Sequence, residues 1–227
     1  MSIFHRKTLL ESGVFQGYAD CHSHILPAVD DGIRTLEDSL SALDYFESIG
    51  FDELWCTPHI MEDMPNRTED LRRSFEELVS AYSGGMRLCL AAEYMMDNAL
   101  FDRLEKDDLL PYGPEGDSLL VETSFVNPPF NMDGLLDKVR SCGLFPVLAH
   151  PERYLYMGKD RILELADSGV KFQMNIVSLT GCYGDFVRDR AEWMYKKKLY
   201  SYSGTDIHSL RVTRERFEKK IRIELCR

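Results

Sequence analysis

The segment Tyr18-Ala19-Asp20-Cys21-His22-Ser23-His24 carries a short strand-like run into two histidines that are one residue apart. Side chains alternate between the two faces of an extended strand, so both imidazoles of this pair point to the same side and can bind one metal ion. His59, His150 and His208 also stand where short apolar runs end. This pattern predicts that the chain collects metal ligands at one end of a sheet or barrel.

Outward from this segment, short apolar runs alternate with stretches of helical spacing, which indicates parallel βα units. The runs lie at residues 18–22, 54–57, 88–92, 118–121, 145–149, 170–174 and 199–204. Helices are predicted over 36–49, 71–82, 135–139 and 162–166, each followed by glycine, with a capping box at Thr35 and Asp38. Seven runs predict a barrel or a doubly wound sheet, and in both architectures sites form at the carboxyl ends of strands.

The composition is that of one globular domain, which we expect to span residues 1–227 with residues 1–16 as an N-terminal extension. The 227 residues are 44% hydrophobic and 29% charged, and the net charge of −11 argues against a nucleic-acid partner. No apolar stretch approaches the ~20 residues of a membrane span. The six cysteines are widely spaced without a C-x-x-C pair, which predicts free thiols in a reducing compartment.

Side chains that bind metals follow nearly every run. They are His22, His24, Asp30, Asp31, His59, Glu93, Glu122, His150, Asp206 and His208, while Asn175 closes the sixth run. A catalytic zinc needs about three protein ligands, so this larger set predicts two or three ions. Imidazole and carboxylate without thiolate suit Mn, Fe or Zn, and adjacent ions assist phosphoryl transfer. Spacing alone does not choose between Asp30 and Asp31.

Six motifs in a fixed order carry a family resemblance. They are His22-Ser23-His24-Ile25-Leu26-Pro27-Ala28-Val29-Asp30-Asp31-Gly32, Thr57-Pro58-His59, Ala92-Glu93-Tyr94, Glu122, Ala149-His150-Pro151-Glu152-Arg153-Tyr154 and Thr205-Asp206-Ile207-His208. With them, residues 17–215 resemble the polymerase and histidinol phosphatase (PHP) superfamily, and within it the CpsB-type bacterial protein-tyrosine phosphatases that regulate capsule synthesis. The resemblance implies an α/β fold, a distorted seven-stranded (βα)7 TIM-like barrel, with a three-metal site.

The resemblance also implies how the ligands are shared. His22, His24, Glu93 and Asp206 would hold the first ion; Glu93, Glu122 and His150 the second; and Asp31, His59 and His208 the third. Asp20 would orient a histidine ring from behind. The cofactor is expected to be two or three divalent ions, Mn first, with Fe, Zn or Mg as alternatives.

Catalytic roles would fall to Arg153, Asp206 and His59. Arg153 would bind phosphate, because a planar guanidinium can hold two phosphate oxygens at once. A second family arginine follows the Asp-x-His motif, and Arg211 and Arg214 are the candidates here, although neither has the expected spacing. We expect a metal-bridging hydroxide to attack phosphorus, and a tyrosine leaving group with a pKa of ~10 to need little proton donation.

The implied function is that of a metal-dependent hydrolase, a protein-tyrosine phosphatase. Its expected partner is the phosphorylated C-terminal tail of a bacterial tyrosine autokinase in capsule or exopolysaccharide export. A cytoplasmic location follows from the same resemblance, peripheral to the inner membrane through the kinase; a homo-oligomer stays open. Phe125, Phe130, Tyr154 and Tyr156 lie past predicted strand ends, where they could frame an aromatic ring or pack the rim.

Three alternatives compete with this interpretation. Cys182 and Arg188 match the C-x5-R skeleton of cysteine-based tyrosine phosphatases, but the bulky Tyr183, Phe186 and Val187 between them would obstruct a phosphate loop. A different PHP phosphatase, such as a histidinol-phosphate phosphatase, would use the same ligands. A non-catalytic PHP binding module is the third, and the complete ligand set argues against it.

Overall fold

The computed structural model describes residues 6–113 and 115–225. The strands in this part of the chain are β1 (Tyr18–Ser23), β2 (Phe51–Cys56), β3 (His59–Ile60), β4 (Arg87–Leu90), β5 (Glu93–Met95), β6 (Ser118–Glu122), β7 (Phe145–Ala149), β8 (Lys171–Asn175) and β9 (Tyr202–Gly204). The α-helices are α1 (Leu36–Ser48), α2 (Thr68–Ala81), α3 (Asn98–Lys106), α4 (Met132–Ser141), α5 (Lys159–Asp167), α6 (Asp185–Lys196) and α7 (Leu210–Phe217).

Every ladder between these strands is parallel. One sheet has the order β1-β2-β4, and the other has the order β3-β5-β6-β7-β8-β9. Two of the seven predicted runs, 54–57 and 88–92, are each followed at once by a further short strand in the other sheet: β3 follows β2 after Thr57-Pro58, and β5 follows β4 after Ala91-Ala92. Backbone bonds from Ala91 N to Cys56 O (2.9 Å) and from Glu93 N to Pro58 O (3.1 Å) bridge these two junctions.

The first and last strands meet at the other side of the strand layer. Ser23 and Ile207 form a parallel bridge, and His24 N donates to Ile207 O at 3.0 Å. Gly204 permits this approach, because a Cβ there would lie 2.6 Å from the Cβ of His22. β9 thus brings Asp206 and His208 beside the histidine pair of β1.

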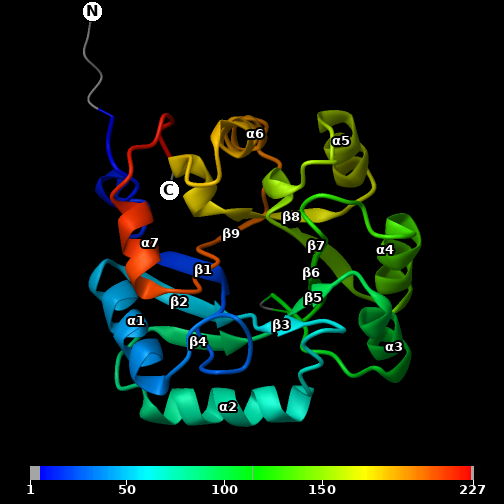
Figure 1. Ribbon diagram of the computed structural model, residues 1–227, viewed down its shortest axis with the longest axis horizontal. Helices are drawn as coiled ribbons and strands as arrows, with labels where there is room; N and C mark the ends of the chain where they lie inside the picture. Colours follow the sequence, from blue (N-terminus) through cyan, green and yellow to red (C-terminus); the bar gives the residue numbers. More distant parts are fainter. Residues whose placement is uncertain (1–5, 114, 226–227) are drawn as a thin grey trace, which may run out of the picture.

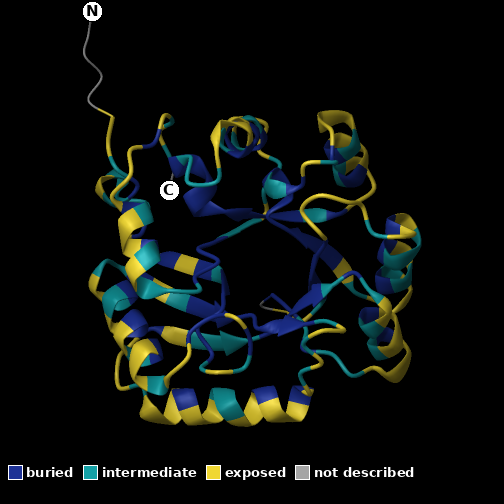
Figure 2. Ribbon diagram, viewed as in Figure 1, coloured by how far each residue is buried: buried dark blue, intermediate teal, exposed yellow. Residues whose placement is uncertain are grey.

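Helices surround the strands on the outside, as Figure 1 shows. The strands are largely buried, whereas each helix has an exposed outer face and a buried inner one (Figure 2). In α2, for example, Leu71 and Leu78 are buried and Val79 is 44% exposed, which follows the helical period. The helices therefore shield the sheets and leave the carboxyl ends of the strands to form a site.

The four predicted helices are confirmed as α1, α2, α4 and α5, with ends that differ by a few residues. Gly143 and Gly169 follow α4 and α5 with φ of 80° and 87°, the left-handed conformation expected after a helix. The Gly84-Gly85 pair does not cap α2, because α2 ends at Ala81 and the next residue, Tyr82, is already extended. Helices α3, α6 and α7 were not located from the sequence.

The described part of the N-terminal extension, residues 6–16, packs against the core through its apolar side chains, while residues 1–5 lie outside the described residues. Leu9 and Phe15 are buried, and the ring centroid of Phe15 lies 4.5 Å from that of Phe217 in α7. Cys21, Cys56, Cys89, Cys142 and Cys182 are free thiols, and Cys226 falls outside the described part. Among the described helices, none combines the length and apolarity needed to cross a bilayer.

The parallel α/β architecture is confirmed, in the form of two sheets. The finer prediction, a closed seven-stranded barrel, stays a prediction.

Candidate metal centre

All nine predicted metal ligands converge at the carboxyl ends of the strands. They are His22, His24, Asp31, His59, Glu93, Glu122, His150, Asp206 and His208, and each lies within 4.0 Å of at least one other, atom to atom. They come from β1, β3, β5, β6 and the loops after β1, β7 and β9. Parallel strands bring their carboxyl ends to one edge, which explains how residues 186 positions apart meet.

Glu93 stands at the centre of this group. Its Oε2 lies 3.1 Å from His22 Nε2, 3.3 Å from His24 Nε2 and 3.2 Å from His59 Nδ1. Its other oxygen, Oε1, lies 3.1 Å from His150 Nε2. A carboxylate that faces several imidazoles with both oxygens suits a ligand shared between two ions.

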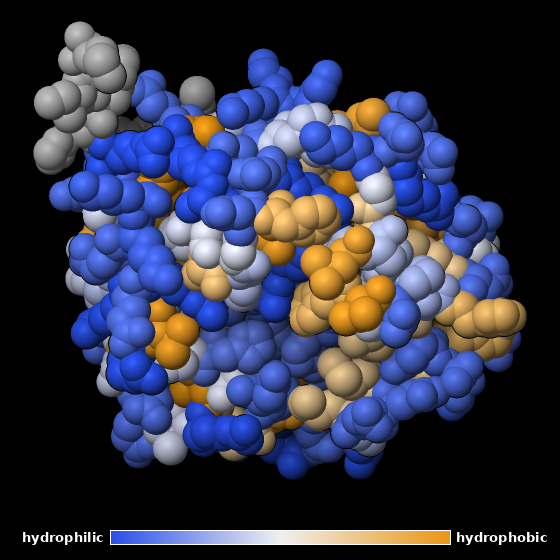
Figure 3. Space-filling model, turned by 45° about the horizontal axis from the view of Figure 1, so that its top comes forward, coloured by the Kyte–Doolittle hydropathy of each residue, from blue (hydrophilic) through white to orange (hydrophobic). Residues whose placement is uncertain are grey.

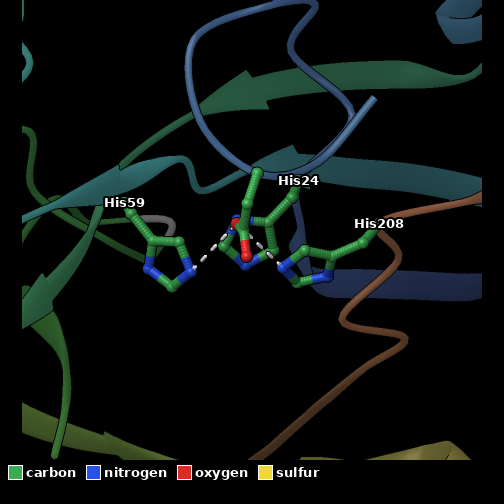
Figure 4. Close-up of side chains that lie close together, drawn as sticks. His24, His59 and His208 are labelled. Atoms are coloured by element: carbon green, nitrogen blue, oxygen red, sulfur yellow. Dashed lines mark ion pairs between the residues drawn. The ribbon is translucent and has the colours of Figure 1, made fainter. Parts of the chain in front are cut away.

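A second gathering lies toward the exposed side. Asp31 Oδ1 lies 3.3 Å from His208 Nε2 and 3.6 Å from His59 Nε2. His24 belongs to the same group of mutually close ligand atoms, and Figure 4 shows His24, His59 and His208 facing a common point from three parts of the chain. Asp31 is 56% exposed in its side chain, so this group opens to solvent.

Glu122 and Asp206 complete the cluster on two other sides. Glu122 Oε1 lies 3.0 Å from His59 Nδ1, and its Oε2 lies 3.9 Å from His150 Nε2. Asp206 Oδ1 lies 3.4 Å from His24 Nε2 and 3.7 Å from His22 Nε2. Asp206 adopts φ of 53°, a left-handed conformation that is costly for a side chain other than glycine and is typical of functional positions.

The donor atoms fit divalent cations. Glu93 Oε2 and His59 Nδ1 lie close to charged neighbours but form no hydrogen bond of regular geometry, and His150 Nδ1 is buried without a hydrogen-bond partner. Burying polar atoms in this way is costly unless a cation binds them. Burial raises the pKa of Glu93, but His22 and His59 outweigh it and hold the pKa well below the usual range. Burial lowers the pKa of His22, whereas the charge of Glu93 raises it to about 9. The Glu93 carboxylate is therefore ionised, as the binding of a cation requires.

Polar side chains behind the ligands set their orientation. His22 Nδ1 lies 3.0 Å from Gln173 Oε1, so it donates there as N–H and leaves Nε2 to face the cluster. His24 Nδ1 donates to Asp30 Oδ2 at 2.8 Å in the same way. Asp20 has a different role from the predicted one: its Oδ1 accepts from the backbone N–H groups of His22 (3.2 Å) and Thr205 (2.8 Å), so it holds backbone rather than a ring.

Arg153 lies beside the ligands, as predicted from its motif. It follows His150 in the 3-10 turn Pro151–Arg153, and its Nη1 donates to Asp206 Oδ2 at 2.7 Å. Its guanidinium carbon lies 4.1 Å from the ring centroid of Phe125 and 4.4 Å from that of Tyr183. Two aromatic rings and one carboxylate therefore hold the guanidinium group of Arg153 in a fixed position.

A cavity of about 500 Å³ opens over the cluster. Its lining includes Asp31, His59, Glu93, Glu122, Phe125, His150, Arg153, Tyr183, Asp206, His208 and Arg216. One face of the molecule, mostly hydrophilic, is shown in Figure 3. The cavity is thus large enough for a phosphorylated side chain, with its metal ligands at the floor and two arginines in its wall.

The predicted second arginine is not brought into this cavity. Arg211 Nη1 lies 2.7 Å from Glu215 Oε1 on the exposed face of α7, and Arg214 lies over the ring of Tyr45 at 4.1 Å. Arg216 is the arginine of α7 that lines the cavity. The sequence did not predict Arg216, because it lies about two helical turns past His208, whereas the family's second arginine is expected only a few residues after the Asp-x-His motif.

Gln173 and Tyr183 were also missed as site residues. Gln173 carried a signal in the sequence, since it is a polar residue within the apolar run that forms β8, and the structure shows that it is fully buried. Tyr183 carried none, because it is positioned by the loop between Thr180 and α6 rather than by a strand end.

The four aromatic residues considered as contacts for a substrate ring lie in different places. Phe125 lines the cavity, whereas Phe130 is 98% exposed away from it. Tyr154 is buried with its hydroxyl donating to Ala149 O at 2.9 Å, and the Tyr156 hydroxyl lies 2.7 Å from Thr123 Oγ1. These two rings therefore pack the rim, which is the plainer of the two interpretations.

The C-x5-R match does not form a phosphate loop. Cys182 Sγ donates to Val177 O at 3.3 Å, and Arg188 pairs with Asp185. Neither lines the cavity. This geometry disfavours a cysteine nucleophile.

Comparisons with known proteins agree with this site. A profile of the family described as "Capsular polysaccharide synthesis, CpsB/CapC" matches residues 18–223. Tyrosine-protein phosphatase CpsB of Streptococcus pneumoniae is 27% identical over 202 residues, 84% of this chain and 83% of its own. Tyrosine-protein phosphatase YwqE of Bacillus subtilis is 23% identical over 198 residues, 85% of this chain and 78% of its own.

A solved structure shares the fold. It comes from a study of YwqE from Bacillus subtilis and CpsB from Streptococcus pneumoniae, described as unique metal-dependent tyrosine phosphatases. It superimposes with a TM-score of 0.74 at 23% identity and covers 86% of this chain and 81% of its own. With a profile match that runs from β1 past α7, this chain belongs to the CpsB/CapC family.

Proposed function

We propose that this protein is a metal-dependent phosphomonoesterase that hydrolyses phosphotyrosine in proteins. The observation that carries the proposal is the convergence of nine imidazole and carboxylate side chains beside Arg153, seven of which line one cavity together with it. Metal ligands in such number need more than one cation, and an arginine beside them supplies a donor for phosphate. The relatives CpsB and YwqE are named tyrosine-protein phosphatases, which favours an aryl phosphate as substrate.

The ligand sharing proposed for the three ions follows the family pattern. His22, His24, Glu93 and Asp206 would hold the first, Glu93, Glu122 and His150 the second, and Asp31, His59 and His208 the third. Two residues lie between sets: His59 Nδ1 is also 3.0 Å from Glu122 Oε1 of the second set, and His24 also belongs to the group of close ligand atoms of the third set. The other distances support the sharing. When bound, the ions would supply the hydroxide nucleophile and neutralise charge on the phosphate. Manganese is the first candidate.

The chain's own residues orient the substrate. Arg153 can donate to phosphate oxygens, since the bond to Asp206 uses only one of the five N–H donors of a guanidinium. Asp206 thereby both faces the histidines and holds Arg153 in place. In this proposal Arg216 takes the place of the second arginine that was expected at Arg211 or Arg214. Phe125 would contact the tyrosyl ring, because it lines the same cavity as the ligands.

We also propose the finer features that the family implies. The two sheets would form one distorted seven-unit barrel, with β2–β3 and β4–β5 each counted as one unit; the Ser23–Ile207 bridge supports this. The whole chain would be one domain, since Phe15 packs against Phe217. The partner would be the phosphorylated tail of a tyrosine autokinase, met in the cytoplasm at the inner membrane.

Hydrolysis of a phosphotyrosine peptide by Mn-loaded protein tests the proposal. We expect turnover that EDTA abolishes and Mn²⁺ restores, and a strong preference over histidinol phosphate. Turnover that persists in EDTA would exclude the metal mechanism, and a preference for histidinol phosphate would favour the other PHP activity. Absence of turnover in fully loaded protein would favour a binding module.

Two variants separate the residues involved. Arg153→Ala should lower kcat/KM by roughly a hundredfold or more, the usual size of losing a charge-assisted donor to the transition state. Cys182→Ser should leave turnover unchanged, because the thiol lies outside the cavity. Loss of turnover in Cys182→Ser would revive the cysteine mechanism.

A further inference from the structure

Tyr183 lies where two arginines from distant parts of the chain meet. Its ring centroid is 4.4 Å from the guanidinium carbon of Arg153 and 4.9 Å from that of Arg216. Arg153 belongs to the turn after β7 and Arg216 to α7, which lies beside the segment that leads into α6 (Figure 1). One aromatic ring therefore contacts both guanidinium groups of the cavity wall.

The hydroxyl of Tyr183 continues this network. It accepts hydrogen bonds from Arg216 Nη1 at 2.9 Å and from Asn175 Nδ2 at 3.3 Å. Asn175 also donates to Asp206 Oδ2 at 2.8 Å, and the same oxygen accepts from Arg153. Tyr183 is therefore linked to Arg153 in two ways: by direct contact with its ring, and through hydrogen bonds that pass by Asn175 and Asp206.

The contacts of Tyr183 reduce the electrostatic repulsion between the two arginines. Two guanidinium groups that face one cavity repel each other, and the carboxylate of Asp206 pairs with Arg153. The negative face of an aromatic ring attracts cations, so a ring shared by both groups offsets part of that repulsion. Burial raises the pKa of Tyr183 to about 12, so it remains a neutral phenol that can accept both hydrogen bonds.

We propose that Tyr183 is a positioning residue that holds Arg153 and Arg216 together as one clamp for the phosphate of the substrate. The inference rests on the proposed function, which supplies the phosphate, and adds to it the residue that orders the arginines. It also gives a role to the loop whose cysteine and arginine formed the C-x5-R coincidence. In that loop the tyrosine next to the cysteine is the residue that reaches the cavity.

Equilibrium binding of inorganic phosphate to the Mn-loaded protein tests the proposal without requiring turnover. Tyr183→Leu removes both the ring and the hydroxyl, and it should raise the Kd for phosphate roughly tenfold. Tyr183→Phe keeps the ring and loses the acceptor, and it should raise the Kd about two- to threefold. In steady-state kinetics the same variants should raise KM for a phosphotyrosine peptide more than they lower kcat.

The chain offers a matched control. Arg214 lies over the ring of Tyr45 at 4.1 Å, an arginine–tyrosine pair of the same kind outside the cavity. Tyr45→Leu removes that pair and should leave phosphate binding unchanged. A double-mutant cycle adds specificity: if Tyr183 acts through Arg216, Tyr183→Leu should cost less in an Arg216→Ala background.

Each outcome decides the proposal. An unchanged phosphate Kd in Tyr183→Leu overturns it, as does an equal rise in the Tyr45→Leu control. If Tyr183→Leu fails to fold, Tyr183→Phe and Arg216→Ala decide, and unchanged phosphate binding in both rejects the clamp. Failure of the proposed function is distinguishable, because it would appear in the wild-type protein as absent hydrolysis.

Discussion

Asp30 and Asp31 are neighbours in the chain, yet their carboxylates face different groups. Asp31 Oδ1 points to His208 and His59. Asp30 Oδ2 accepts from the ring of His24 and from the backbone N–H of His59 at 3.1 Å, so it lies behind the ligands. Gly32 makes this turn possible, because a Cβ there would clash with His24 O. In the proposed metal centre, one turn of backbone therefore separates a ligand, Asp31, from the residue that supports the ligands, Asp30.

The two aspartates therefore predict different losses. Asp31→Ala should release about one ion per chain, since it removes a ligand from the most exposed set. Asp30→Asn should keep the number of ions and weaken binding by roughly 10- to 100-fold, the usual effect of a supporting group. Metal analysis after dialysis, with titration against a chelator, distinguishes these results. Identical losses in both variants would contradict the assignment.

Gln173 gives a second prediction at this scale. Its Oε1 lies 3.0 Å from His22 Nδ1 and 3.2 Å from His150 N, so it fixes both the ring of one ligand and the backbone of another. Gln173→Leu should weaken metal binding by roughly 10- to 100-fold, because it removes the acceptor that selects the His22 tautomer. Gln173→Glu keeps an acceptor oxygen but loses the donor to Met174 O at 2.6 Å, so it should retain more of the affinity than Gln173→Leu but less than wild type. Equal affinity in Gln173→Leu and wild type would refute the role.

At the scale of elements, the sequence predicted those local features that depend on the chemistry of a single residue. Thr35 was predicted as a helix cap, and its hydroxyl accepts from the N–H of Asp38 at 3.1 Å at the start of α1. The run at 54–57 predicts one strand, and the structure adds a second short strand, β3, just past Pro58, which has no N–H to continue a ladder. The spacing of apolar residues predicts which residues are buried, but it does not predict which strand pairs with which.

The cap carries a prediction about stability. Thr35→Ala should lower the free energy of unfolding by about 1 kcal/mol, because the N–H of Asp38 loses its partner at the helix terminus. Urea denaturation should detect the change as a lower midpoint with an unchanged slope. Thr35→Ser retains the hydroxyl and should behave like wild type. A drop in Thr35→Ser as large as that in Thr35→Ala would show that packing of the methyl group, not the cap, is responsible.

At the scale of the molecule, the ligands of the centre come from both sheets. His22 lies in β1 and His24 directly follows it, whereas Glu93, Glu122 and Asp206 come from strands or strand ends of the other sheet. The sequence predicted that these residues meet, because parallel units place their carboxyl ends together. It could not predict Arg216 or Tyr183, since helix packing and a loop conformation bring them to the cavity. Site residues on strand ends were thus predictable, and those on helices and loops were not.

Because ions at this centre would tie the two sheets together, metal removal should loosen their junction. The backbone bonds His24 N to Ile207 O (3.0 Å) and Asp206 N to His22 O (2.8 Å) join β1 to the segment after β9. We expect EDTA to lower the melting temperature, since ligands that bind only the folded state stabilise it. Amide hydrogen exchange at His24 and Asp206 should then speed up roughly tenfold or more, while the β6–β7 ladder should change little. Uniform acceleration across both sheets would instead mean that the ions stabilise the whole fold, and no change at the junction would mean that the sheets hold together without them.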